Sequence, residues 1–170
     1  YESKTGSTAK YAEDIAKRVN GDVFPLKKFK LRKMADYDTI VFGGWIRGGE
    51  IQGLNKFLQG WEYISEKNVL IFGSGMSFAT KEGREQLINQ NLLDMYHVRF
   101  YQMRGSFDFN KLGFLEKIMI KASVSRLSGD DLPAEQSALA TILQQPIEWY
   151  DAEKVDRIVT VIETLAVGGK

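Results

Sequence analysis

Two short apolar runs that end in glycine constrain the fold of this chain more than any other feature of its sequence. They are DTIVFGG, at Asp38–Gly44, and NVLIFGSG, at Asn68–Gly75. Continuous apolar runs of this length suit parallel strands that are buried on both faces, with each carboxyl end opening into a loop. Segments with helical spacing lie between such strands along the chain. The alternation predicts a doubly wound α/β fold around a parallel sheet.

The remaining elements follow from periodicity and capping residues. We expect two further strands, at Val23–Leu26 and Val98–Met103, and a short helix at Leu54–Gln59. Three longer helices show apolar stripes at the i, i+3, i+4 spacing of a buried face, and their ends carry capping residues. The stripes are Ala12, Ile15, Ala16 and Val19 before Gly21; Leu87, Ile88, Leu92 and Tyr96 after Thr80; and Val155, Ile158, Val159, Ile162 and Leu165 after Asp151.

A hydroxyl-rich loop, Ser3-Lys4-Thr5-Gly6-Ser7-Thr8, precedes the first helix. The first amides of a helix have no intrahelical acceptor, and together with the helix dipole they bind anions. Glycine allows close approach of the backbone, and the hydroxyls add donors suited to a phosphate monoester. In this fold such a loop follows a strand, so we expect roughly five to seven apolar residues ahead of Tyr1. The alternative is an ordinary Ser/Thr helix cap.

Composition excludes several classes of function. The chain of 170 residues has no cysteine, which rules out thiol nucleophiles, thiolate metal sites and disulfides. Its 23 basic and 22 acidic residues give a net charge of +1, which does not favour nucleic acid as a partner. The single histidine, His97, has no ligand-spaced acidic neighbours, so we expect no metal site. No apolar run reaches the roughly 18 residues that span a bilayer.

Two more glycine-rich loops are expected at the carboxyl edge of the sheet, Gly43–Gly53 and Gly73–Thr80. Ligands of doubly wound folds bind at this edge, at the topological switch point. Each loop carries an aromatic residue, Trp45 or Phe78, whose face can stack on a flat ring. A phosphate loop beside two such loops predicts a site for flavin mononucleotide (FMN).

The pattern Y-x-S-x-T-G-x-T at Tyr1–Thr8 resembles the phosphate loop of the flavodoxin family. Two longer stretches, Tyr37–Leu58 and Phe114–Asp131, resemble one branch of it, the flavodoxin-type, menaquinone-dependent protoporphyrinogen dehydrogenases. The resemblance implies a flavodoxin-like five-stranded parallel sheet of order 2-1-3-4-5, with the first strand largely upstream of Tyr1. It implies one domain over residues 1–170, with an insertion at about 105–150.

The resemblance also implies which residues surround FMN. Around the phosphate it places Ser3, Lys4, Thr5, Gly6, Ser7 and Thr8; beside the flavin ring it places Trp45, Ile46, Arg47, Gly48 and Gly49 together with Ser74, Gly75, Met76, Ser77 and Phe78. Carrier flavodoxins place an aromatic residue later in the first ring loop, where this chain has Arg47 and Gly48. A guanidinium there favours negatively charged reduced flavin, and so two-electron chemistry. No catalytic residue is assigned, because a flavin needs positioning and electrostatics more than side-chain chemistry.

We therefore expect a cytoplasmic FMN-binding oxidoreductase whose partner is a redox protein, a quinone or another small molecule, and whose branch suggests quinone-coupled protoporphyrinogen dehydrogenation. One alternative is a soluble flavodoxin-type electron carrier, although such carriers are usually acidic. Another is a flavin-free regulatory or interaction module on the same fold. The segment 111–127 is apolar on one side and basic, which indicates packing on the sheet or, alternatively, peripheral contact with a membrane.

Overall fold

The computed structural model describes residues 1–76, 80–106 and 148–168. Its contacts divide the chain into two units, Tyr1–Gly105 with Tyr150–Lys170, and Ser106–Trp149. Most of the second unit, including the predicted segment 111–127, lies outside the described residues. The first unit contains all the strands and helices described below.

The predicted parallel sheet is confirmed. It has four strands, β1 (Thr39–Arg47), β2 (Glu50–Ile51), β3 (Asn68–Gly75) and β4 (Arg99–Arg104), in the order β2-β1-β3-β4. The pairs β1–β3 and β3–β4 are parallel, while β1–β2 is an antiparallel hairpin. The register aligns Trp45 with Ser74 and Ser74 with Met103, so the carboxyl ends of the three parallel strands meet at one edge.

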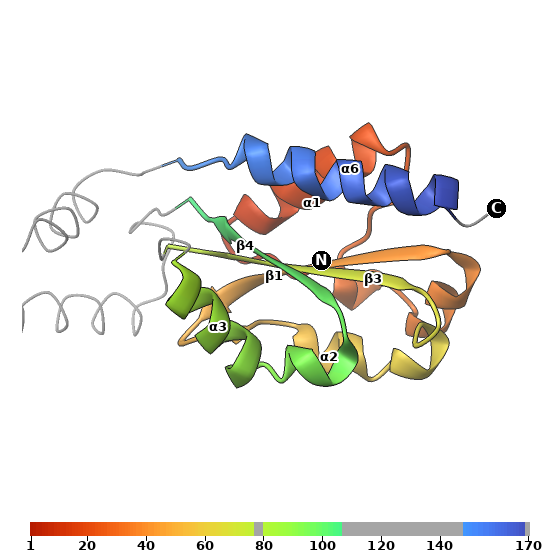
Figure 1. The fold of residues 1–170 in the computed structure, drawn as a ribbon, viewed down its shortest axis with the longest axis horizontal. Coiled ribbons are helices and arrows are strands. Elements are labelled where there is room, and N and C mark those ends of the chain that lie inside the picture. The colour runs from red at the N-terminus through yellow and green to blue at the C-terminus, as the bar shows by residue number, and fades with distance from the viewer. Residues whose placement is uncertain (77–79, 107–147, 169–170) are drawn as a thin grey trace, which may run out of the picture. The chain divides into compact units, whose positions relative to one another are not determined.

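Helices cover both faces of the sheet, as a doubly wound fold requires (Figure 1). On one face lie α1 (Ser7–Arg18) and α6 (Ala152–Gly168); on the other lie α2 (Leu54–Leu58) and α3 (Lys81–Gln90). Short 3-10 turns complete the described elements at Leu26–Lys28, Leu31–Asp36, Trp61–Tyr63 and Leu93–Tyr96.

Alternation along β3 builds the two halves of the core. Val69 and Ile71 belong to the cluster on the α2–α3 face, whereas Leu70 and Phe72 belong to the cluster on the α1–α6 face. All four side chains are buried, as expected for a central strand covered on both sides. The predicted stripe of α6 is confirmed, because Val155 and Ile158 are fully buried in the second cluster.

Two predicted helix caps are confirmed. Thr80 Oγ1 accepts a hydrogen bond from the Gly83 N–H at 3.0 Å and begins α3. Asp151 Oδ1 accepts from the Lys154 N–H at 3.3 Å and begins α6. Each side chain binds one of the orphan amides of its helix.

Three details of the prediction are wrong. Val23–Leu26 forms no strand: among the described residues it pairs with Tyr1 alone, through Tyr1 N to Phe24 O at 2.8 Å and Leu26 N to Tyr1 O at 2.7 Å. One residue cannot sustain a ladder. Leu92 is 58% exposed because α3 ends at Gln90 and Leu92 adopts a left-handed conformation. The strand predicted to end at Gly44 continues to Arg47 and turns back as β2.

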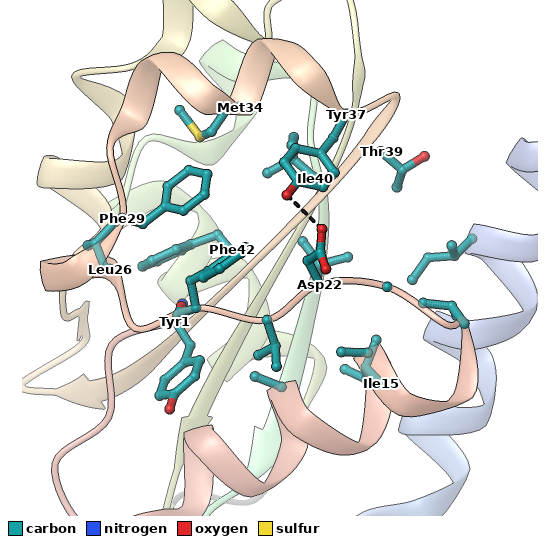
Figure 2. Close-up of a pocket in the computed structure, with 18 of the residues that line it drawn as sticks. Tyr1, Ile15, Asp22, Leu26, Phe29, Met34, Tyr37, Thr39, Ile40 and Phe42 are labelled. Atoms are coloured by element: carbon teal, nitrogen blue, oxygen red, sulfur yellow. Dashed lines mark hydrogen bonds between the residues drawn. The ribbon is translucent and has the colours of Figure 1, made fainter.

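An apolar cleft of about 190 Å³ lies between Asp22–Leu26, the free edge of β1 at Thr39–Phe42 and the side of α1 (Figure 2). Beside it, Glu2 forms a parallel bridge to Gly44, with Glu2 N donating to Gly43 O at 2.8 Å. Tyr1 and Glu2 thus lie between the two chain segments that border the cleft.

Candidate functional site

The loop before α1 is shaped by two hydrogen bonds that define where the helix begins. Gly6 is the N-cap, with φ of +102°, and its carbonyl accepts the first intrahelical bond, from Lys10 N at 2.9 Å. Ser3 Oγ accepts from the Ala9 N–H at 3.3 Å. Ser3 therefore caps the helix across the loop, and the amides before Ala9 have no intrahelical acceptor.

Open space beside Gly6 makes the loop accessible to a ligand. A Cβ at this position would have no atom of the described residues within 4 Å, and Gly6 is exposed. The positive φ favours glycine here, since L side chains rarely adopt it. The amino end of α1 therefore offers backbone donors and the positive end of a helix dipole to a small anion.

Besides Ser3, two predicted phosphate residues contact the neighbouring loops. The Thr8 side chain is buried, and its hydroxyl lies 2.7 Å from the hydroxyl of Ser74 at the end of β3. This bond ties the first loop to the third. Lys4 is exposed, and its ammonium lies 5.3 Å from the centroid of the Trp45 ring, a cation–π contact that ties the first loop to the second.

Three residues that were predicted in the second loop, Trp45, Ile46 and Arg47, lie at the end of β1, and they differ in how deeply they are buried. The side chain of Ile46 packs over the strand glycines Gly73 and Gly75, where a Cβ would come within 2.9 Å and 3.2 Å of it. Ile46 therefore belongs to the packing of the sheet. Trp45 is half-buried, and Arg47 is exposed at the end of β1.

Gly48 and Gly49 form a tight two-residue turn between β1 and β2. Both have positive φ, +57° and +82°, which is the requirement of a type I′ hairpin. The turn is held from outside: Gln90 Nε2 donates to Gly48 O at 2.9 Å, and Asn91 Nδ2 donates to Gly49 O at 2.8 Å.

The third loop, Gly73–Thr80, is described except for residues 77–79. Ser74 is buried against Thr8, and Gly75 O accepts from the Gly105 N–H at 2.7 Å, which joins the ends of β3 and β4. Ser77 and Phe78 lie outside the described residues, so their predicted place beside a ring stays a prediction. The structure therefore brings the first and second loops, and the start of the third, to one edge of the sheet.

Sequence reasoning missed the Tyr11 hydroxyl, which joins α1 to the end of β4 and to the start of α6. The Tyr11 hydroxyl donates to Arg104 O at 2.6 Å and accepts from the Asp151 N–H at 2.7 Å. Burial raises the pKa of Tyr11, so the hydroxyl stays protonated. Tyr11 lies four residues before Ile15 on the buried stripe, and that spacing was the available signal. Gln90 and Asn91 were also missed, because nothing local in the sequence links them to the turn at Gly48.

The described part of the chain contains neither a group of metal-ligating side chains nor a membrane-spanning helix. No three acidic or histidine side chains there are grouped to hold a metal ion. No helix among those residues is long and apolar enough to cross a bilayer.

The fold and the three converging loops define a doubly wound α/β protein with an anion-accepting loop at the carboxyl edge of its sheet. Residues 1–132 match the family described as "Flavodoxin domain". The match covers more than half of the chain's 170 residues, and the chain therefore belongs to this family.

Two other comparisons accompany the family match. A solved structure described as "Structure of a flavodoxin from the domain Archaea" is similar at 18% sequence identity and a TM-score of 0.42. The similarity covers 61% of this chain and 79% of that one. A search of curated proteins finds no match.

Proposed function

We propose that this chain binds FMN non-covalently and works as an FMN-dependent oxidoreductase. The observation that carries the proposal is the loop Ser3–Thr8: in a chain of the flavodoxin-domain family, it presents the amino end of α1 beside the ends of two parallel strands. When bound, FMN supplies the electron-transfer chemistry. The protein's own residues bind and orient it.

The phosphate fits the amino end of α1. Charge-assisted hydrogen bonds from backbone amides to an oxyanion are stronger than neutral ones, and the space beside Gly6 leaves room for a phosphate to approach. Ser3 and Thr8 hold the loop in shape through Ala9 and Ser74. We assign them to positioning the loop, and we assign phosphate binding to the amides and to the hydroxyl of Thr5.

On the ring side, the half-buried Trp45 and the turn at Gly48 and Gly49 form one wall of the proposed site. The Lys4 ammonium lies over the Trp45 ring, so a flavin that stacked on this face would displace it. Arg47 is exposed at the strand end, where its guanidinium is free to approach a ring edge. A cation there stabilises negatively charged reduced flavin and favours two-electron transfer.

The near-neutral charge of the chain favours an enzyme over an electron carrier. Carriers that dock through electrostatic steering benefit from a strong field of one sign, whereas this chain has a net charge of +1. The electron carrier and the flavin-free module are the alternatives. Protoporphyrinogen and quinone as substrates, a cytoplasmic location and membrane contact through 111–127 stay predictions. Of the two stretches that suggest the branch, 37–58 is among the described residues and 114–131 is not.

The test uses Thr5→Glu. An acidic residue at the amino end of a helix stabilises the helix through its dipole, yet here it would occupy and repel the phosphate subsite. We expect wild-type protein to retain FMN through gel filtration with a bound-flavin absorbance spectrum. The variant should lose FMN while unfolding at the same or higher temperature. A variant that retains FMN as well as wild type would contradict the proposed phosphate site.

Reduction of the wild-type complex with dithionite then separates the two redox roles. We expect the absorbance to pass from oxidised to fully reduced flavin in a single two-electron step, which would justify assays with protoporphyrinogen and menaquinone. Reduction in two separate one-electron steps would favour the electron carrier. Failure of wild-type protein to bind FMN would favour the flavin-free module.

A further inference from the structure

Two neighbouring amide side chains at the end of α3 hold the turn between β1 and β2. Gln90 Nε2 donates to the Gly48 carbonyl at 2.9 Å, and Asn91 Nδ2 donates to the Gly49 carbonyl at 2.8 Å. Asn91 Oδ1 accepts from the Ile51 N–H at 2.9 Å. Of the four backbone positions from Gly48 to Ile51, three (all but Glu50) are thereby fixed by side chains from the end of α3.

The holding amides are themselves fixed. Asn91 Nδ2 also donates to the Leu87 carbonyl at 2.8 Å, so the amide is anchored to the last turn of α3. The Gln90 amide is packed against the turn, since a Cβ at Gly49 would come within 2.1 Å of Gln90 Oε1. The turn and the helix end therefore form one packed unit.

This contact determines which backbone group the turn presents to its other side. A trans peptide holds its C=O and N–H on opposite sides. Because the Gly48 carbonyl faces Gln90, the Gly49 N–H points away from α3, and it has no acceptor among the described residues. The outer side of the turn is therefore a hydrogen-bond donor. The edge of an oxidised flavin ring carries mostly acceptors, namely ring nitrogens and carbonyl oxygens.

We propose that Gln90 and Asn91 are positioning residues of the flavin site, which fix the turn so that the Gly49 N–H meets an acceptor on the ring. The proposal rests on the proposed function, since it concerns the ring side of the same site. Its consequence is specific: loss of the holding bonds weakens every ligand that carries the ring, whether or not it carries a phosphate.

The affinity test compares Gln90→Glu with Gln86→Glu. Gln86 lies one turn earlier on α3 with an exposed side chain, so it is a control for the added charge. Glutamate at position 90 cannot donate to the Gly48 carbonyl. We expect Gln90→Glu to weaken FMN and riboflavin by the same factor, about threefold to tenfold, the loss of one hydrogen bond. Gln86→Glu should stay within about twofold of wild type, and visible circular dichroism of the bound flavin should change only in Gln90→Glu.

A second pair of variants tests the holding contact without any ligand. Asn91→Asp keeps an oxygen to accept from Ile51 but loses the donor to Gly49, whereas Asn91→Ala loses both. We expect hydrogen exchange at the Ile51 amide to accelerate at least about tenfold in Asn91→Ala and to stay near wild type in Asn91→Asp. In each variant the affinities for FMN and for riboflavin should fall by the same factor, because both variants lose the hydrogen bond to the Gly49 carbonyl.

The outcomes separate this inference from the proposed function. Wild-type affinity for both flavins in Gln90→Glu and Asn91→Asp would overturn it while leaving FMN binding intact. A loss confined to FMN would also overturn it, because the effect would then act through the phosphate. If wild-type protein binds neither flavin, the proposed function fails and the role toward the ring fails with it. Unchanged exchange at Ile51 in Asn91→Ala would refute the holding contact itself.

Discussion

At the scale of single residues, Gly43 shows how closely the sheet and its covering side chains fit. The Phe72 ring lies across the position where a Cβ of Gly43 would stand, 2.1 Å from the nearest ring carbon. Phe72 is buried on the α1–α6 face and cannot move without disturbing that cluster. Gly43 was predicted as part of a strand end and as the first residue of a glycine-rich ligand loop. Its packing role could not be predicted, because it depends on the register of β1 with β3.

We predict that Gly43→Ala lowers the free energy of unfolding by about 1–3 kcal/mol, the usual cost of forcing an extra carbon into a packed core. Denaturant unfolding measures the change. Gly168→Ala is the control, because a Cβ at Gly168 would have nothing within 4 Å. Equal stability of Gly43→Ala and wild type would show that the ring moves aside freely.

Tyr150 couples α1 to the start of α6 and should make stability depend on alkaline pH. Its ring stacks on Tyr11 at 5.0 Å between centroids, and its hydroxyl donates to Asp14. Burial, together with the hydrogen bond to Asp14 and the charge of Asp14, raises the pKa of Tyr150 to about 12. An unfolded tyrosine ionises near pH 10, so the unfolded state releases its proton first as pH rises.

The contribution of the Tyr150 hydroxyl is therefore fully present below about pH 10 and is lost as pH rises toward about 12. We predict that wild-type protein is more stable than Tyr150→Phe at neutral pH and that the difference shrinks over this window. Denaturant titrations of both proteins at several pH values give the difference directly. A difference that stays constant from pH 7 to 11.5 would contradict the assignment.

At the scale of elements, the sequence predicted the three parallel strands of the sheet, but it was wrong about a strand at Val23–Leu26 and missed the antiparallel strand β2. β3 forms over the predicted residues, and β4 lies within one residue of the prediction, because each combines an apolar pattern with a complete parallel ladder. Val23–Leu26 has the composition of a strand, but in the described part of the chain its backbone pairs with Tyr1 alone. The hairpin at Gly48 and Gly49 was missed because the glycine-rich stretch was interpreted as a ligand loop alone.

The apolar cleft beside Tyr1 has the geometry of a strand position. Gly43 O accepts from Glu2 N, so alternate residues of β1, Val41 and Thr39, turn their backbone groups toward the same edge. Among the described residues no strand pairs with that edge between Thr39 and Phe42. An extended segment joined to Tyr1 would continue the pairing that Glu2 begins with Gly44. The prediction of a strand ahead of Tyr1 stays a prediction.

We predict that a variant carrying five apolar, β-branched residues ahead of Tyr1 unfolds at a higher denaturant concentration than the chain itself. Burial of that segment in the cleft and its hydrogen bonds to β1 supply the stabilisation. The matched control carries five Gly and Ser residues at the same position, which have little apolar surface to bury. Equal stability of the two extended variants would show that the cleft does not accept a strand.

At the scale of the whole molecule, the placement of the candidate site was the most predictable property. A parallel sheet brings the carboxyl ends of its strands to one edge, so glycine-rich segments after two apolar runs had to meet there. The individual roles were less predictable. The Thr8 hydroxyl is hydrogen-bonded to Ser74, and Ile46 packs over strand glycines. The amides that hold the turn, Gln90 and Asn91, come from a helix end far along the chain.

The central claim is that the amino end of α1 binds the phosphate of FMN, and a paired titration with FMN and riboflavin tests it most directly. The two ligands share the ring and differ in the phosphate. Quenching of flavin fluorescence gives both dissociation constants under the same conditions. We predict that FMN binds at least about thirtyfold more tightly, since charge-assisted bonds from the loop amides contribute about 2 kcal/mol or more. Equal affinities, or no binding of FMN, would contradict the account.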